Sequence, residues 1–322
     1  MTVVSSLGAM ACAAIWGFDD YSPEGQDAGD ANIIDAPAGD AANDADVVDA
    51  GPCGANATFT KSDVLGITNR GWVSMRSATL SPNERTIYFH GKREAGETES
   101  LYVAKRNSRT EAFGEPELLK NVNAPPGPNI SPSISVDGRT LVFSRSTTDA
   151  AYDLFVARRS GEDADFAGAS PITPVNTPAF DQNPFLRPSV EELWFSSTRL
   201  DAGGPRIFRA SAGGGSFVDA GYVPISDPKS TRQEAPVISA DGKILFYSGN
   251  GDDPAGDAND IWEARANTAG GPFTARGRVV ELSASGFLDY PSWLSPDGCR
   301  LYMQSAIGGA QGAKIYVGER KP

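Results

Sequence analysis

Short alternating runs of apolar and polar residues fill most of the chain after residue 58, and Gly, Pro, Asp or Asn bound each run. Apolar side chains at every second position are typical of β-strands that bury one face. No segment after Phe59 has the sustained helical period of an amphipathic α-helix. The pattern therefore predicts an all-β fold.

A unit of four such runs recurs five times. Each unit opens with a phenylalanine after a polar loop, at Phe59, Phe113, Phe166, Phe217 and Phe273. A turn phrase recurs as well, in SVDGRTLVF, SADGKILFY and SPDGCRLYM, where Asp-Gly predicts a two-residue hairpin turn with positive φ at both positions. SPNERTIYF and RPSVEELWF lack the dipeptide, so their hairpins should turn differently. Four-stranded units of this length are typical of β-propeller blades.

The ends of the repeat region indicate how the ring closes. The fifth unit stops after its third strand, whereas FTKSDVLG, residues 59–66, is an opening strand with no unit before it. Placing this strand at the outer edge of the last blade removes an exposed sheet edge. We therefore predict a five-bladed β-propeller of four-stranded blades over residues 56–322, closed by the N-terminal strand.

The recurring phrase resembles the WD-repeat-like propeller repeat of TolB-type periplasmic proteins, with its core P-x-x-S-P-D-G-k-x-x-x-F-x-S-x-R. Ser295–Gly298 matches it best, SVDGRTLVFSR and SADGKILFYS match well, and RPSVEELWFSSTR keeps the strand and the Ser-x-Arg end. The resemblance covers residues 59–320. It implies six blades, where we count five units, and it does not specify an activity because propellers host many chemistries.

The first sixty residues differ from the repeats. Residues 1–18 contain the apolar stretch VVSSLGAMACAAIWGF, which resembles a secretory signal and is too short to span a bilayer. Within it, GAMAC resembles a degenerate bacterial lipobox and predicts lipidation of Cys12; the alternative is a buried Cys12 in an ordinary cleaved signal. Residues 19–55, rich in Asp, Ala and Gly, predict a disordered acidic linker.

The net charge of −13 is concentrated in this N-terminal part, since ten of the 41 acidic residues and none of the 28 basic ones precede Lys61. The nearly neutral repeat region lacks the basic footprint of a nucleic-acid-binding protein. No later run approaches the ~20 apolar residues of a membrane span. We predict an exported monomer, periplasmic or attached to the outer membrane through a lipid anchor only.

The cysteines offer a second link between the chain ends. If Cys12 is lipidated, Cys53 and Cys299 remain, and ring closure brings the segment before the first strand close to the last blade. An exported location permits a disulfide bond between them. Two unpaired thiols are the alternative.

Four polar residues precede the inner strand of their units by a similar offset: Asn129, Asp181, Glu234 and Asp289. We expect them near one mouth of the central channel, as a candidate binding site. The three carboxylates could also converge as in a glycosidase, which needs a pair of carboxyl groups with different roles. A position that recurs in most units is more simply explained by a structural cap at the start of the inner strand.

The remaining candidates are weaker. His90, the only histidine, is predicted to lie in a surface loop, and one histidine argues against Ser-His-Asp, Cys-His and His-built zinc sites. Asp252, Asp253, Asp257 and Asp260 could offer oxygen ligands to Ca²⁺, but their order does not match the helix-loop-helix calcium motif, so we predict no metal and no cofactor.

No nucleophile–base pair stands out from the repeats. The main hypothesis is therefore a non-catalytic module that binds an envelope protein or a polysaccharide through the channel mouth. The alternative is a carbohydrate-active enzyme that uses the channel carboxylates.

Overall fold

The computed structural model describes Cys53 and residues 57–321, except for short internal segments: 124–126, 147–150, 189–191, 201–202, 214–215, 228–229, 252–258, 285 and 308–311. These residues belong to the unit Ala45–Pro322. The apolar stretch, Cys12 and all of the acidic linker except Cys53 lie outside the described residues, so their predictions stay predictions.

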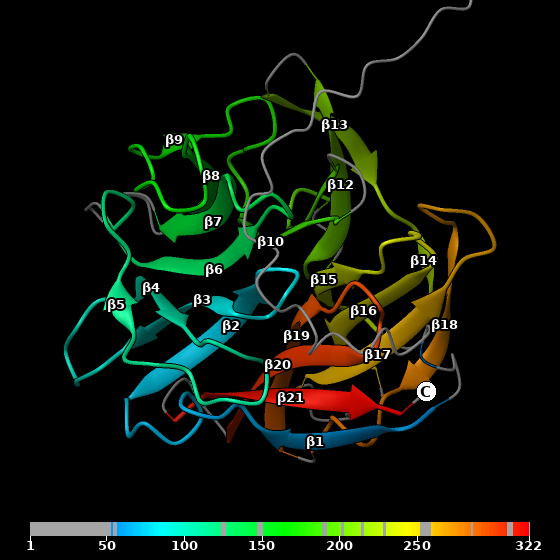
Figure 1. Cartoon of the computed structure of the whole chain (residues 1–322). Coiled ribbons are helices and arrows are strands. Elements are labelled where there is room, and N and C mark those ends of the chain that lie inside the picture. The colour runs from blue at the N-terminus through cyan, green and yellow to red at the C-terminus, as the bar shows by residue number, and fades with distance from the viewer. Residues whose placement is uncertain are drawn as a thin grey trace, which may run out of the picture. The chain divides into compact units, whose positions relative to one another are not determined.

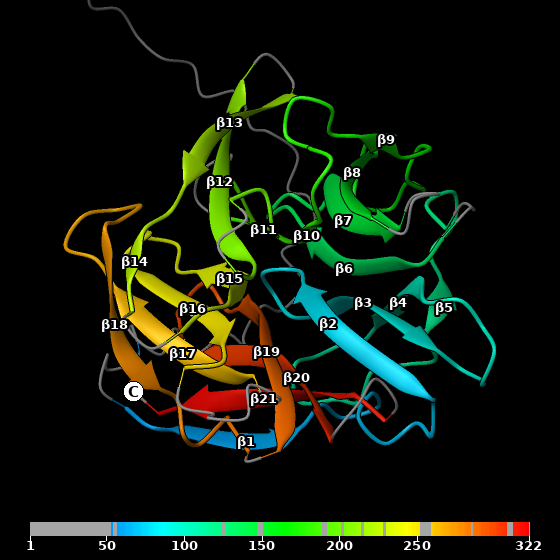
Figure 2. The same cartoon turned by 180° about the vertical axis from the view of Figure 1, so that it is seen from behind.

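Five sheets radiate from a common axis and form the blades of a propeller (Figures 1 and 2). The first two blades are β2 (Ser74–Leu80), β3 (Thr86–Lys92), β4 (Ser100–Lys105) with β5 (Glu117–Leu118), and β6 (Asn129–Ile134), β7 (Thr140–Ser146), β8 (Tyr152–Arg158) with β9 (Ser170–Pro171). The third is β10 (Asp181–Leu186), β11 (Glu192–Ser197), β12 (Arg206–Gly213) and β13 (Ser216–Tyr222).

The last two blades are β15 (Gln233–Ile238), β16 (Ile244–Gly249), β17 (Asp260–Arg265), β18 (Phe273–Arg278) with the short parallel strand β14 (Ile225–Ser226), and β19 (Phe287–Leu294), β20 (Arg300–Ile307), β21 (Lys314–Arg320) with β1 (Phe59–Asp63). The predicted five-bladed all-β propeller is confirmed. The described residues contain no helix, and so none that could span a membrane.

The last blade takes its outer strand from the start of the propeller. β1 pairs antiparallel with β21, with Phe59 opposite Arg320 and Asp63 opposite Tyr316. The two strands run side by side in both views although they are far apart in sequence (Figures 1 and 2). The predicted ring closure is confirmed.

The hairpin turns that join the first and second strands of three blades differ from the prediction. Gly138, Gly242 and Gly298 have positive φ, but the aspartates before them do not. The Gly138 N–H donates to the Ser135 carbonyl at 2.9 Å, and the Arg139 N–H donates to Asp137 Oδ1 at 3.0 Å. The prediction of two positive-φ residues is wrong because a Ser-x-Asp-Gly turn, held by the aspartate side chain, replaces the two-residue loop.

The recurring phenylalanines anchor the outer parts of the blades. All five that open the units are buried, so each adds to the packing of the outer part of a blade. In three cases an arginine at the end of the third strand or directly after it lies over the ring, which adds a cation–π contact to the packing. These pairs are Arg106 over Phe113 (4.2 Å), Arg159 over Phe166 (4.5 Å) and Arg320 over Phe59 (4.1 Å).

Candidate functional site

Five residues at equivalent positions of the inner strands line one cavity on the propeller axis: Arg76, Ile130, Gln182, Glu234 and Tyr290. Their equivalence follows from the strand register, because their partners on the second strands are His90, Ser144, Ser196, Ser248 and Gln304. The cavity has a volume of about 310 Å³, within the range of small-ligand sites. Every blade contributes to the cavity, and the residue type at this strand position differs from blade to blade.

Beside this cavity, four blades each contribute a residue with a strained backbone conformation. Ser77, Ser131, Asn183 and Ala235 follow the cavity-lining residues in the first four blades and have φ between 45° and 52°. They line both the cavity and a much smaller void of about 20 Å³. Such left-handed non-glycine residues cost of order 1–3 kcal/mol each and gather at functional sites.

His90 lies at the contact between the first and second blades, so the prediction that it lies in a surface loop is wrong. β3 continues through His90, which is 3% exposed. Its Nδ1 accepts a hydrogen bond from the Ser131 N–H of the next blade at 3.1 Å. The hydroxyls at the equivalent positions act in the same way, with Ser144 Oγ accepting from Asn183 N at 3.1 Å and Ser196 Oγ from Ala235 N at 2.9 Å. His90 is therefore neutral, with its proton on Nε2.

Because His90 accepts this hydrogen bond as a neutral side chain, the free energy of unfolding should depend on pH. Burial, and secondly the charge of Arg76, lower the pKa of His90 well below its ordinary 6.5. The unfolded chain then binds the extra proton first, so stability should fall below about pH 6.5 by up to about 1.4 kcal/mol per pH unit. In His90→Ser, which installs the residue of the neighbouring blades, this loss should disappear. Urea unfolding at pH 7 and pH 5 measures the difference.

The carboxyl groups of Glu234 and Asp289 have raised pKa values, so they stabilise the folded state as the pH falls. Both groups are present in the wild type and in His90→Ser. The difference between the two unfolding series therefore isolates His90. Equal losses in the wild type and in His90→Ser would contradict the assigned role.

Of the four residues expected at the channel mouth, only Glu234 lines the cavity. Asn129, Asp181 and Asp289 occupy the preceding strand position, which is Gln233 in the fourth blade. Successive residues of a strand face opposite ways, so a shift of one position moves a side chain to the other face. The structure therefore does not bring the four residues together here.

The other three residues hold the starts of the inner strands. Asp181 Oδ1 accepts from Arg199 Nη2 at 2.8 Å, and Asn129 Oδ1 accepts from Arg145 Nε at 2.7 Å. Arg199 belongs to the Ser-x-Arg end of its repeat phrase, whereas Arg145 directly follows a serine at the end of its own phrase. Asp289 Oδ2 accepts from a backbone N–H, that of Ala284, at 2.9 Å. These contacts favour the structural-cap alternative for all three.

Glu234 is a buried carboxyl group whose pKa is raised. The residue is 3% exposed, and Oε1 accepts from Arg232 Nη2 at 3.1 Å and from Asn259 Nδ2 at 2.9 Å. Among the described residues Oε2 has no partner. Burial raises the pKa of Glu234, and the contacts with Arg232 and Asn259 offset this only in part. A carboxyl group tuned in this way suits general acid catalysis.

Two tyrosines and several amides complete the lining. Burial raises the pKa of Tyr152 and of Tyr290, so both are neutral, and the Tyr290 hydroxyl accepts from Asn259 Nδ2 at 2.8 Å. Gln182 and Gln304 add donors and acceptors from two further blades. Aromatic rings with a polar edge, next to amides, suit a ligand with an apolar face and many hydroxyl groups.

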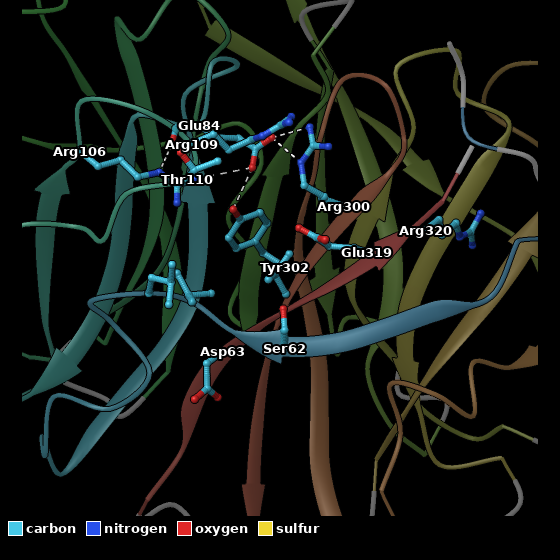
Figure 3. Close-up of a pocket in the computed structure, with 13 residues that line it drawn as sticks. Ser62, Asp63, Glu84, Arg106, Arg109, Thr110, Arg300, Tyr302, Glu319 and Arg320 are labelled. Carbon is cyan, nitrogen blue, oxygen red and sulfur yellow. Dashed lines mark hydrogen bonds and ion pairs between the residues drawn. The ribbon is translucent and has the colours of Figure 1, made fainter. Parts of the chain in front are cut away.

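A larger cavity, of about 570 Å³, lies at the seam between the first and last blades (Figure 3). Its central acid, Glu84, accepts hydrogen bonds from Arg300 Nε at 2.6 Å and from the Tyr302 hydroxyl at 2.9 Å. Arg106 lies 3.8 Å from the same carboxylate. Because these charges satisfy one another across the seam, they stabilise ring closure. The axial cavity is the better candidate site although it is smaller.

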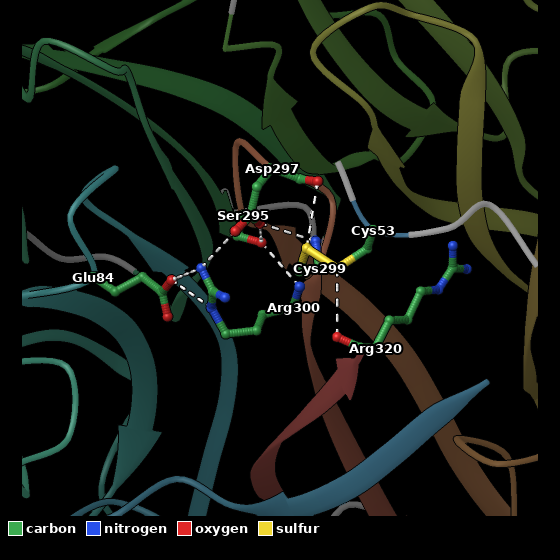
Figure 4. The surroundings of a disulfide bond; sticks show 7 residues. All are labelled: Cys53, Glu84, Ser295, Asp297, Cys299, Arg300 and Arg320. Carbon is green, nitrogen blue, oxygen red and sulfur yellow. Dashed lines mark hydrogen bonds and ion pairs between the residues drawn. A yellow bond between two sulfur atoms is a disulfide. The ribbon is translucent and has the colours of Figure 1, made fainter. Parts of the chain in front are cut away.

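The seam also contains a disulfide bond between Cys53 and Cys299, with Cα atoms 5.3 Å apart (Figure 4). Cys299 lies in the hairpin turn between β19 and β20, and its carbonyl accepts from the Arg320 N–H at 2.8 Å. The bond therefore fixes the segment before β1 to the last blade, beside β21. The alternative of two free thiols does not apply in this structure.

Metal ligands do not gather in the part of the chain that the structure describes, where no group of three His, Cys, Asp or Glu residues could hold an ion. Asp252, Asp253 and Asp257 of the acidic loop lie outside the described residues. Asp260 pairs with Arg278 at 3.2 Å. The structure therefore adds nothing in favour of the calcium alternative.

Comparisons with known proteins identify the fold through structures alone. No protein-family model matches the chain, and no curated protein matches it in sequence. A thermostable family-43 glycoside hydrolase has a TM-score of 0.54 at 14% identity, over 79% of this chain and 92% of that one. A glycosyl hydrolase from Bacteroides ovatus has a TM-score of 0.52 at 12% identity, over 81% and 93%.

TolB from Acinetobacter baumannii is also similar, with a TM-score of 0.46 at 16% identity over 77% of this chain. This chain spans about half of the TolB structure, 55% of its length. At such identities the likeness in each case concerns the fold, a β-propeller.

The interpretation as a non-catalytic binding module is corrected by these comparisons. The two structures named above with TM-scores above 0.5 are glycoside hydrolases, which fits the alternative of a carbohydrate-active enzyme better than the binding module.

The sequence prediction rested on carboxylates that recur between units. At the five equivalent positions that line the cavity, Glu234 is the only carboxylate. Aligning the units on Ser131-Pro132, Asn183-Pro184 and Ala235-Pro236 would have separated Glu234 from the structural caps.

Proposed function

We propose that this chain is a carbohydrate-active enzyme that hydrolyses a glycosidic bond in the axial cavity, with Glu234 as the proton donor. The observation that carries the proposal is the state of Glu234. It is the one carboxyl group in the described lining of the cavity, it is buried with a raised pKa, and among the described residues its hydrogen bonds go to Oε1. A glycosidase needs such a group to protonate the leaving oxygen.

The surrounding residues give this proton donor a fixed position. Arg232 and Asn259 hold Oε1, which leaves Oε2 to carry the proton and to reach the glycosidic oxygen. Tyr152 and Tyr290 flank the sugar ring, and Gln182 and Gln304 bind its hydroxyl groups. Glycosidases of this kind pair two carboxyl groups. The second one has to come from outside the described lining of the cavity.

Release of reducing ends from a panel of neutral and acidic oligosaccharides tests the proposal. We expect turnover of at least one substrate, and we expect it to stop in Ile130→Trp, which fills the cavity from the second blade and leaves residue 234 a glutamate. Thermal unfolding checks that this variant is folded. Absence of hydrolysis across the panel, or unchanged hydrolysis in folded Ile130→Trp, would contradict the proposal.

We also propose that the enzyme is exported, is anchored in the membrane through a lipid on Cys12 and acts on an envelope or extracellular polysaccharide. The lipobox-like GAMAC supports the anchor, the turn phrase at Ser295–Gly298 supports a TolB-type repeat, and the Cys53–Cys299 bond suits an oxidising compartment. Mass spectrometry of the mature protein should find a diacylglyceryl group on an N-terminal Cys12. A cytoplasmic protein that retains Met1 would contradict export.

A further inference from the structure

The Arg76 guanidinium lies in the axial cavity without a counter-ion. The residue extends from β2, lines the cavity, and has a buried Nε with no hydrogen-bond partner. Among the residues that the structure describes, no carboxylate forms an ion pair with it. Two other arginines of the propeller are paired with carboxylates, Arg320 with Glu263 at 2.9 Å and Arg199 with Asp181 at 2.8 Å, and the buried Arg145 donates to the Asn129 side chain and the Val122 carbonyl.

The cavity itself does not neutralise this charge. Its one described carboxyl group, Glu234, comes from the fourth blade and is already bound by Arg232 and Asn259. His90, beside Arg76 on the neighbouring strand, is neutral because its Nδ1 accepts a hydrogen bond from Ser131. Tyr152 and Tyr290 are neutral as well. The cavity therefore presents one uncompensated positive charge.

A ligand can supply the missing counter-charge. A cation withdrawn from water is costly unless it is paired. A planar guanidinium matches a carboxylate especially well, because it can donate two parallel hydrogen bonds. A neutral sugar in this cavity would cover Arg76 without pairing it, whereas a sugar that bears a carboxylate would pair it.

We propose that the axial cavity accepts an acidic sugar, a hexuronate residue of a polysaccharide, whose carboxylate binds Arg76. The inference deepens the proposed function and rests on it in taking the ligand to be a carbohydrate. Arg76 and Glu234 occupy equivalent positions in the first and fourth blades, which are not neighbours in the ring. One sugar can thus be held at its carboxylate from one side while its glycosidic oxygen faces Glu234 from another.

Calorimetric titration of the wild-type protein compares three acidic trisaccharides, made of galacturonate, glucuronate or mannuronate, with their carboxyl-reduced counterparts. Each pair differs only in the carboxylate. We expect at least one uronide to bind roughly tenfold or more tightly than its reduced form, as for a charged hydrogen bond. Arg76→Gln should abolish this preference and Arg76→Lys should keep part of it. Arg109→Gln, at an exposed position, should leave it unchanged.

The outcomes separate this inference from the proposed function. Uronide binding that depends on Arg76, without hydrolysis, would support the acidic ligand and contradict the enzyme. Hydrolysis of neutral oligosaccharides that Arg76→Gln leaves unchanged would support the enzyme and overturn the acidic ligand. Inorganic phosphate or acetate that binds as tightly as any uronide would also overturn it, because the site would then be one for small free anions.

Discussion

Glu234→Gln should reduce kcat on any substrate of this enzyme by roughly 10²- to 10⁴-fold, the usual contribution of a general acid. The amide has nearly the shape of the acid, and its oxygen can still accept from Arg232 and Asn259. It cannot supply the proton that the leaving oxygen needs. Steady-state rates of the folded variant measure the loss, and the wild-type rate should fall as pH rises through the raised pKa of Glu234.

The fold should survive this substitution. A carboxyl whose pKa is raised by folding favours the folded state below its unfolded pKa and loses that contribution as pH rises through the folded pKa. Near pH 7 the neutral glutamine therefore avoids the cost of a buried charge. We expect its midpoint of thermal unfolding to equal or exceed that of the wild type, so a loss of activity would not reflect unfolding.

Asp289→Asn is the matched control. Asp289 is also a buried carboxyl with a pKa raised by burial, and its contact with the Ala284 N–H can be kept by an amide oxygen. It does not line the cavity. Turnover by Asp289→Asn should stay within a few-fold of the wild type. Equal losses in the two variants, or wild-type turnover in Glu234→Gln, would refute the assignment of Glu234.

Replacing both Cys53 and Cys299 by serine should lower the free energy of unfolding by about 5 kcal/mol. The disulfide joins residues 246 positions apart, so it restricts nearly the whole propeller in the unfolded chain. In the folded ring it holds the segment before β1 next to β21, which is where the closing strand would otherwise detach. Urea unfolding under oxidising conditions compares the double variant with the wild type.

Reduction provides an independent check on this prediction. Wild-type protein unfolded in dithiothreitol should lose a similar amount of stability, whereas the double variant should not respond to the reductant. Equal urea midpoints for oxidised and reduced wild type would show that ring closure does not depend on the bond.

Much of the fold is determined by the sequence itself. Alternation of apolar residues, the five opening phenylalanines and the incomplete last unit each depend on neighbours within one blade, so they can be read locally. The orphan strand at Phe59 then fixed the pairing with β21, because the last blade has no outer strand of its own. The approach of Cys53 to Cys299 follows from that closure.

The candidate site was decided by tertiary structure. Glu234 occupies the strand position after that of Asn129 and Asp181, so its side chain lies on the opposite face, and the strand pairing shows which face lines the cavity. His90 and Arg76 acquire their roles from contacts across blades, with Ser131 and with the open cavity. Local patterns report which side of a strand is buried. They do not report which residues of five separate blades meet on the axis, because that depends on how the ring closes.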